Sequence, residues 1–79
     1  MFDFTVYKDN SLTEFEKACA TFEKEYPQAK KNDVLIDVDG TVIQSYETDG
    51  GETTFYDDYE LGAVYLKSDL DLSRVFYKR

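Results

Sequence analysis

The stretch VLIDVDGTVIQSY, Val34 to Tyr46, decides the fold. Two runs rich in β-branched residues flank the dipeptide Asp39-Gly40, and Asp-Gly between such runs is a strong signal for a tight hairpin. With a two-residue loop, the predicted cross-strand pairs are Val38 with Thr41, Ile36 with Ile43, and Val34 with Ser45. These pairs share one mostly apolar face, which we expect to face the core.

The segment before this hairpin has the spacing of an amphipathic helix. Ser11 and Glu14 fit a capping box, in which each side chain accepts a hydrogen bond from the other residue's backbone N–H. Pro27 restricts the residue before it, so the helix should end at Tyr26. The predicted buried stripe consists of Leu12, Phe15, Ala18, Cys19, Phe22 and Tyr26.

Alternation of apolar and polar residues predicts further strands at residues 2–7, 53–59 and 62–67, with a turn at residues 48–52. The tail has two interpretations. Leu70 to Lys78 could form a closing strand, which we prefer, or Ser68-Asp69 could cap a short helix. The fold class predicted is α+β: a single domain over residues 1–79, with one amphipathic helix on a four- to five-stranded antiparallel sheet in the order β-α-β-β-β-β.

Composition narrows the class of protein. The chain has 79 residues, is 42% hydrophobic and 33% charged, and carries a net charge of −8 with no His. This charge repels nucleic acid and anionic membranes and favours basic partners. One Cys cannot form an internal disulfide, no apolar run is long enough to span a membrane, and the start lacks a signal peptide. We expect a soluble cytoplasmic protein, in the host cytoplasm if the gene belongs to a phage.

The run Asp37-Val38-Asp39-Gly40-Thr41 resembles the first motif of the haloacid dehalogenase phosphatases. That resemblance implies Asp37 as nucleophile and Asp39 as acid/base, with Mg²⁺ bound beside them. The family needs a parallel sheet of βαβ units, which 79 residues cannot supply, and its later Lys and acidic motifs do not follow in order. We therefore interpret Asp-Gly as a turn and expect no enzyme activity, no catalytic residue, no metal and no cofactor.

The distribution of charge is the clearest functional signal. Between Lys31 and Lys67 there is no Lys or Arg, whereas the terminal segments carry the bases. Acids two residues apart on a strand lie about 6.6 Å apart, a spacing of the order of successive nucleic-acid charges. The pairs Glu47/Asp49 and Asp69/Asp71 could be arranged in this way. The acids of the base-free stretch are Asp33, Asp37, Asp39, Glu47, Asp49, Glu52, Asp57, Asp58 and Glu60.

These features resemble the small acidic DNA mimics encoded by phages, including anti-CRISPR proteins. The stretch FYDDYELGAVYLKSDL, Phe55 to Leu70, is similar to the acidic C-terminal part of an anti-CRISPR that blocks the PAM-reading site of Cas9. The similarity rests on Phe55-Tyr56, Asp58 and the run Leu66 to Leu70. It implies that Asp57, Asp58, Glu60 and Asp69 are the first carboxylates to test.

We therefore predict a non-enzymatic inhibitor that docks an acidic face on a basic nucleic-acid-binding protein, such as a Cas effector or a nuclease. An immunity protein or antitoxin that neutralises a cationic nuclease is the alternative, and a phosphatase fragment is a remote one. No direct contact with nucleic acid or membrane is expected, and the oligomeric state stays open. The predicted partner-binding residues are Asp37, Asp39, Glu47, Asp49, Glu52, Tyr56, Asp57, Asp58, Tyr59, Glu60 and Asp69.

Overall fold

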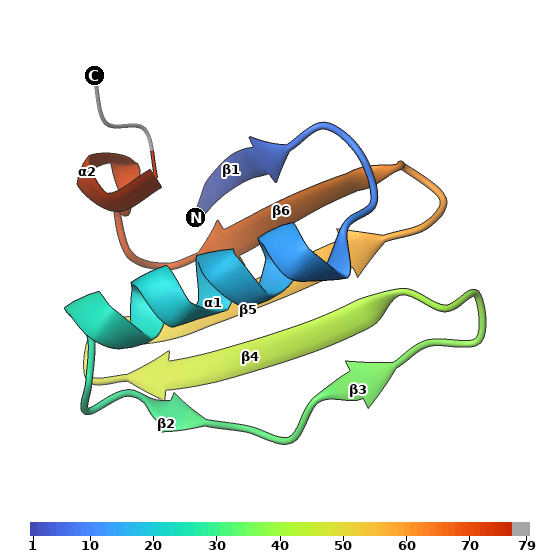
Figure 1. Cartoon of the computed structure of the whole chain (residues 1–79). Coiled ribbons are helices and arrows are strands. Elements are labelled where there is room, and N and C mark those ends of the chain that lie inside the picture. Colours follow the sequence, from blue (N-terminus) through green and yellow to red (C-terminus); the bar gives the residue numbers. More distant parts are fainter. Residues whose placement is uncertain (77–79) are drawn as a thin grey trace.

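The computed structural model describes residues 1–76 and consists of one antiparallel sheet with two helices (Figure 1). The elements are β1 (Phe2–Tyr7), α1 (Leu12–Glu25), β2 (Lys30–Lys31), β3 (Leu35–Ile36), β4 (Val42–Thr48), β5 (Gly51–Asp58), β6 (Ala63–Ser68) and α2 (Ser73–Phe76). The strands lie in the order β1-β6-β5-β4-β2, and β3 also pairs with β4. The predicted α+β class is confirmed. The sheet has six strands because two short strands, β2 and β3, share one edge of β4.

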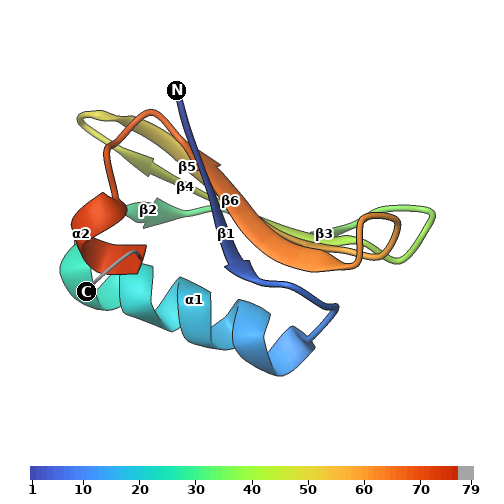
Figure 2. The same cartoon turned by 90° about the horizontal axis from the view of Figure 1, so that it is seen from above.

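Both helices lie on the same side of the sheet (Figure 2). Phe22 of α1 is fully buried, and its ring lies 4.9 Å from the ring of Tyr46 and 5.6 Å from that of Phe55. The ring of Phe76, in α2, lies 5.9 Å from that of Phe55. The buried apolar residues are Phe4, Phe15, Ala18, Cys19, Phe22, Tyr46, Phe55, Val64, Leu66 and Leu72. The core therefore lies in a single layer between the helices and the sheet.

The start of α1 confirms half of the capping box. The Ser11 hydroxyl accepts a hydrogen bond from the backbone N–H of Glu14 at 3.1 Å. The backbone N–H of Ser11 donates to the carboxylate of Asp57 at 3.1 Å, so Asp57 takes the place expected for Glu14. The helix ends at Glu25, with Tyr26 as its C-cap before Pro27, as predicted. The predicted stripe is buried from Phe15 to Phe22, whereas Tyr26 is half-buried and Leu12 is 53% exposed.

The hairpin register was predicted wrongly by one residue. Leu35 pairs with Ile43 and Ile36 with Val42, and the backbone N–H of Asp37 donates to the carbonyl of Thr41 at 2.8 Å. The turn is present, with Gly40 at φ +91°, but residues 38–40 form the loop rather than Asp39-Gly40 alone. The carboxylate of Asp39 accepts from the backbone N–H of Thr41 at 2.9 Å and stabilises this longer loop.

A slip of one residue exchanges the two faces of a strand pair. The face predicted to be apolar core is therefore wrong: Val34 is 51% exposed and Ile36 is 71% exposed. Gln44 and Tyr46 point to the core instead, and Tyr46 is fully buried. The physical reason lies in α1, because the Tyr46 hydroxyl donates to Glu23, a partner that no local pattern indicates.

The later strands agree with the prediction, and the tail does not. Thr48 pairs with Gly51, so residues 49–50 form the turn of the β4–β5 hairpin, and β6 follows a second turn. The closing strand predicted from Leu70 to Lys78 is wrong where the structure describes it, because residues 73–76 form α2. Asp71, rather than Ser68-Asp69, accepts from the N–H and hydroxyl of Ser73 at 3.1 and 2.7 Å. Residues 77 and 78 lie outside the described residues.

Candidate docking surface

The side of the sheet away from the helices, here called the open face, has paired aromatic residues at its centre. Residues that pair across antiparallel strands share a face, which places Ile43, Tyr56 and Tyr65 in one row. The rings of Tyr56 and Tyr65 stack with centroids 4.8 Å apart and 16° between their planes. Both residues are half-buried, although no helix covers this face. The open face therefore offers apolar area as well as polar edges.

One end of the sheet gathers the acids of two neighbouring turns; we call this group, Asp37, Asp39, Asp58 and Glu60, the Asp37 end. The loop before β4 and the turn after β5 are in contact here. The backbone N–H of Tyr59 donates to the Thr41 hydroxyl at 3.3 Å, and a Cβ placed on Gly40 would lie 2.8 Å from the Tyr59 ring. Tyr59 is 58% exposed, so its ring both covers Gly40 and faces solvent.

The opposite end gathers a second group, Glu47, Asp49, Glu52 and Asp69, which we call the Asp49 end. Glu47 and Glu52 are direct cross-strand partners, an arrangement in which like charges repel. The carboxylate of Asp69 accepts from the backbone N–H of Glu52 at 3.0 Å, and the N–H of Asp69 donates to the carbonyl of Glu52, also at 3.0 Å. All four acids are exposed.

The acids predicted to form one patch thus form two groups. Asp58 ends β5, and Glu52 lies six residues before it, so the two ends are separated by about 20 Å at about 3.3 Å per residue. Glu47 lies on β4 and Asp49 in its turn, whereas Asp69 and Asp71 follow β6 and so lie on no strand. The open face lies between the two groups.

Asp57 belongs to neither group. It is only 4% exposed and points to the helix side, where its carboxylate accepts from Ser11 and from the Asn10 side chain at 3.1 and 3.4 Å. Asp57, predicted to bind a partner, is therefore not part of the exposed acidic surface. Its neighbour Asp58 lies near solvent, and the backbone N–H of Leu61, together with bonds from Tyr65 and Glu60, holds the pKa of its carboxyl below the usual value.

Few bases offset these charges within residues 1–76. Two ion pairs are present there, Lys17 with Glu14 at 3.5 Å and Lys31 with Glu23 at 3.0 Å, and neither includes an acid of the two ends. Lys30 stands opposite Glu47 in the β2–β4 register without forming such a pair. Both ends therefore present carboxylates that keep their charge available for a partner.

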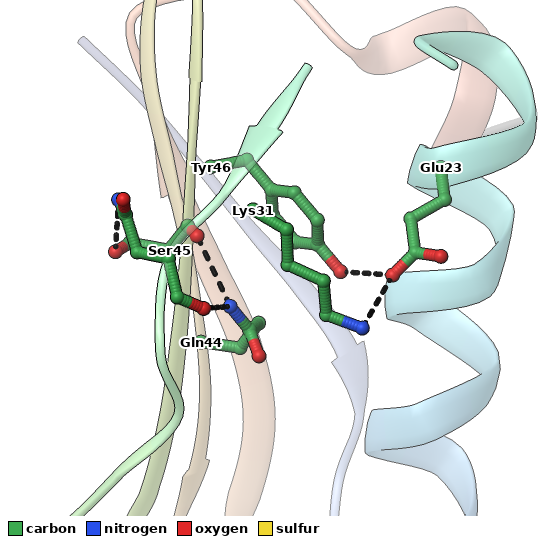
Figure 3. A network of polar contacts seen from close by, with 6 residues as sticks. Glu23, Lys31, Gln44, Ser45 and Tyr46 are labelled. Carbon is green, nitrogen blue, oxygen red and sulfur yellow. Dashed lines mark hydrogen bonds and ion pairs between the residues drawn. The ribbon is translucent and has the colours of Figure 1, made fainter. Parts of the chain in front are cut away.

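Glu23 and Lys31 form a polar contact that the sequence did not indicate (Figure 3). The Tyr46 hydroxyl donates to Glu23 Oε2 at 2.5 Å, and Lys31 Nζ lies 3.0 Å from the same oxygen. The bond from Tyr46, with a smaller contribution from Lys31, lowers the pKa of Glu23. The contact fixes β2 and β4 beneath α1, so its role is structural.

The residues that resemble a phosphatase motif lie in a different structural setting here. Asp37 lies in a loop between antiparallel strands, whereas the phosphatase motif follows a strand of a parallel sheet. The carboxylate of Asp37 accepts a hydrogen bond from the backbone N–H of Val38 at 2.7 Å. Burial raises the pKa of the Cys19 thiol to about 11, so the reactive thiolate is scarce at neutral pH. Within the described part of the chain, no cluster of three or more His, Cys, Asp or Glu is placed to hold a metal ion.

Comparisons with known proteins give no relative for this chain. No protein family matches it, and neither the curated proteins nor the solved structures contain a significant match. In residues 1–76, no helix is long and apolar enough to cross a membrane.

Proposed function

We propose that the protein is a non-enzymatic inhibitor that docks its acidic surface on a basic nucleic-acid-binding protein and occupies the path of the nucleic acid. One observation carries this proposal: within residues 1–76, two groups of carboxylates that form no ion pair stand at the two ends of a sheet face that no helix covers. Keeping like charges together costs self-repulsion in a small domain, which favours a functional reason for them.

The separation of the two groups supports imitation of a nucleic-acid strand. About 20 Å corresponds to roughly six base pairs of a DNA duplex, because each strand carries one phosphate per 3.4 Å or so of helix axis. Lys and Arg side chains that normally hold those phosphates would bind the two acidic ends instead. The stacked Tyr56 and Tyr65 lie between the ends and offer aromatic area where a protein would otherwise stack bases.

A Cas effector is the first target to test, because Phe55 to Leu70, the segment similar to an anti-CRISPR, contributes to both ends. It comprises the second half of β5, the turn and all of β6, with Asp58 and Glu60 at one end and Asp69 at the other. The place of action in this proposal is the cytoplasm of the cell that holds the effector. The segment therefore carries negative charge at both ends of the β5–β6 hairpin.

The experiment measures displacement of a labelled PAM-containing duplex from a Cas9–guide RNA complex. We expect the protein to displace the duplex and to bind less well when duplex is added first. Neutralising one pair at each end, Asp39→Asn with Glu60→Gln and Asp49→Asn with Glu52→Gln, should slow association and flatten its dependence on salt. The matched control, Asp9→Asn with Glu14→Gln near the start of α1, removes the same charge and should bind like the parent.

Three results decide the outcome. An equal loss of binding in the control and in the end variants would contradict the proposed docking surface, because only net charge would then matter. No displacement from Cas9, together with inhibition of a cationic nuclease by the same ends, would place the protein with the immunity proteins and antitoxins. Failure to inhibit either class of target would overturn the proposal as a whole.

A further inference from the structure

The edge of the sheet at β3 exposes an unusual amount of apolar surface. Val34, Leu35, Ile36 and Val38, here called the apolar edge, are 51%, 62%, 71% and 103% exposed. β3 pairs with β4 on one side, and no other described strand lies on its outer side. An exposed apolar edge strand invites pairing with another chain, and proteins usually protect such edges with charge or Pro. This edge is a candidate for binding.

A groove runs beside the apolar edge, because α1 packs over β1, β5 and β6 and leaves the β3 side of the sheet uncovered. Its volume is about 520 Å³. Leu12, Phe15 and Ala20 of α1 form one wall, and Val34, Ile36 and Val42 form the other. Apolar side chains from outside could therefore enter between the helix and the sheet.

The charges along the edge select the occupant. Asp33, Asp37 and Asp39 alternate with or follow the apolar residues and are all exposed. A second copy of this chain paired antiparallel about Leu35 would set Asp33 of one copy opposite Asp37 of the other, and like charges directly opposite destabilise a strand pair. A segment with Lys or Arg at those places gains from the same geometry. The edge therefore favours a basic partner over a second copy.

We propose that the apolar edge binds an extended segment of the target protein as an added strand beside β3. Alternate side chains of a strand point to opposite faces, so the segment places apolar residues in the groove beside Val34 and Ile36. Its Lys or Arg residues then meet Asp33 and Asp37 on the other face. This inference rests on the proposed function, which supplies the basic character of the target. It adds that the protein binds an extended segment of that target.

The test uses a synthetic ten-residue peptide that alternates Val with Lys and is blocked at both ends. In ¹⁵N-labelled protein we expect amide shifts to concentrate at residues 33–38 and at Leu12 and Phe15. A Val–Glu peptide of the same length should not bind, and a peptide N-methylated on its pairing edge should bind about tenfold more weakly, because it cannot donate to β3.

Two substitutions provide a matched pair. Ile36 is 71% exposed and Leu61, in the β5–β6 turn, is 70% exposed, so Ile36→Ser and Leu61→Ser remove similar apolar surface. We expect Ile36→Ser to weaken the peptide about tenfold, and Leu61→Ser to leave affinity unchanged. Equal effects of the two variants, or peptide shifts confined to the Asp49 end, would overturn the proposal. A dimer of the parent in sedimentation, lost in Ile36→Ser, would overturn it in favour of a second copy.

The result separates this inference from the proposed function. Peptide binding at residues 33–38 without inhibition of Cas9 or a nuclease would leave the edge as a binding site and reject the inhibitor. Inhibition that depends on the Asp49 end, but is equal in the parent and Ile36→Ser, would support the inhibitor and reject the edge.

Discussion

The buried carboxylate of Asp57 accepts a hydrogen bond from the backbone N–H of Ser11 at 3.1 Å, joining β5 to the start of α1 across 46 residues. An anionic group at a helix N-terminus also interacts favourably with the helix dipole. This one contact fixes where the helix begins relative to the sheet, and the first prediction follows from it.

Replacing Asp57 with Ala should lower the free energy of unfolding by about 1.5–3 kcal/mol, because the backbone N–H of Ser11 and the side-chain amide of Asn10 lose a charged acceptor. Asp57→Asn keeps an acceptor and should cost less. Urea unfolding followed by circular dichroism measures both. Asp33→Ala, at an exposed position, is the control and should change stability little. Equal stability of Asp57→Ala and this control would show that the contact does not form.

The lowered pKa of Glu23 makes part of the stability depend on acidic pH. A carboxyl whose pKa is lower in the folded state stabilises the fold above its unfolded pKa, about 4.3 for Glu, and loses that contribution as pH falls through the folded value. The parent should therefore exceed Glu23→Gln in stability at neutral pH, and the difference should shrink below about pH 4. Thermal unfolding from pH 2 to 7 measures this difference.

The same experiment has an internal control. Tyr46→Phe keeps the buried ring and removes the hydroxyl, which is the largest cause of the shift. In this background, Glu23→Gln should alter the pH dependence less than it does in the parent. An unchanged effect would assign the pH dependence to Lys31 rather than to Tyr46.

Gly51 and Gly62 should respond differently to Ala. Gly51 has φ +135°, and an added Cβ would lie 2.5 Å from the Cβ of Asp69, so Ala meets both backbone strain and a clash. Gly62 has φ +65° and open space around it, so Ala meets backbone strain alone, about 1–2 kcal/mol. We expect a larger fall in Tm for Gly51→Ala, and amide shifts at Glu52 and Asp69. Equal falls would contradict the close approach of Gly51 to Asp69.

Tyr65 should make the fold sensitive to alkali. Burial, aided by the bond donated to Asp58, raises its pKa to about 12. A raised pKa stabilises the fold below the unfolded value of about 10, and the contribution is lost as pH rises toward 12. Tyr65→Phe should make this decline smaller and leave the part that the raised pKa values of buried Cys19 and Tyr46 contribute, whereas Tyr56→Phe leaves the bond to Asp58 in place and should keep the full decline. Chemical unfolding between pH 9 and 12 checks the order.

Local signals predicted the parts of the fold that local interactions decide. Ser11 and Pro27 bound the helix by capping and by steric restriction, and the pattern found both. The Asp39–Gly40 register failed because the Asp39 side chain stabilises a longer loop, and because Tyr46 gains a partner on a distant helix. The prediction of a closing strand was wrong because Asp71 caps a helical turn, and Phe76 in that turn packs on Phe55.

The candidate site was likewise predicted only as far as local sequence signals reach. The distribution of acidic residues along the sequence indicated which side chains could bind a basic partner. It did not indicate that these side chains divide between two ends of a sheet. It also could not show that Asp57 is buried, since its partner Ser11 is remote in sequence. The sequence did not reveal the apolar edge, because the predicted register placed Val34 and Ile36 in the core. A correct loop length would have revealed it.

The pairing of the first strand with the last carries a consequence for biosynthesis. Phe2 pairs with Ser68, and β6 is the strand neighbour of β1 in the described sheet. During translation, β1 emerges from the ribosome before β6, so β1 cannot join the sheet until residues 63–68 have also emerged. The β1 edge of the sheet is therefore completed only after the other strands have been synthesised.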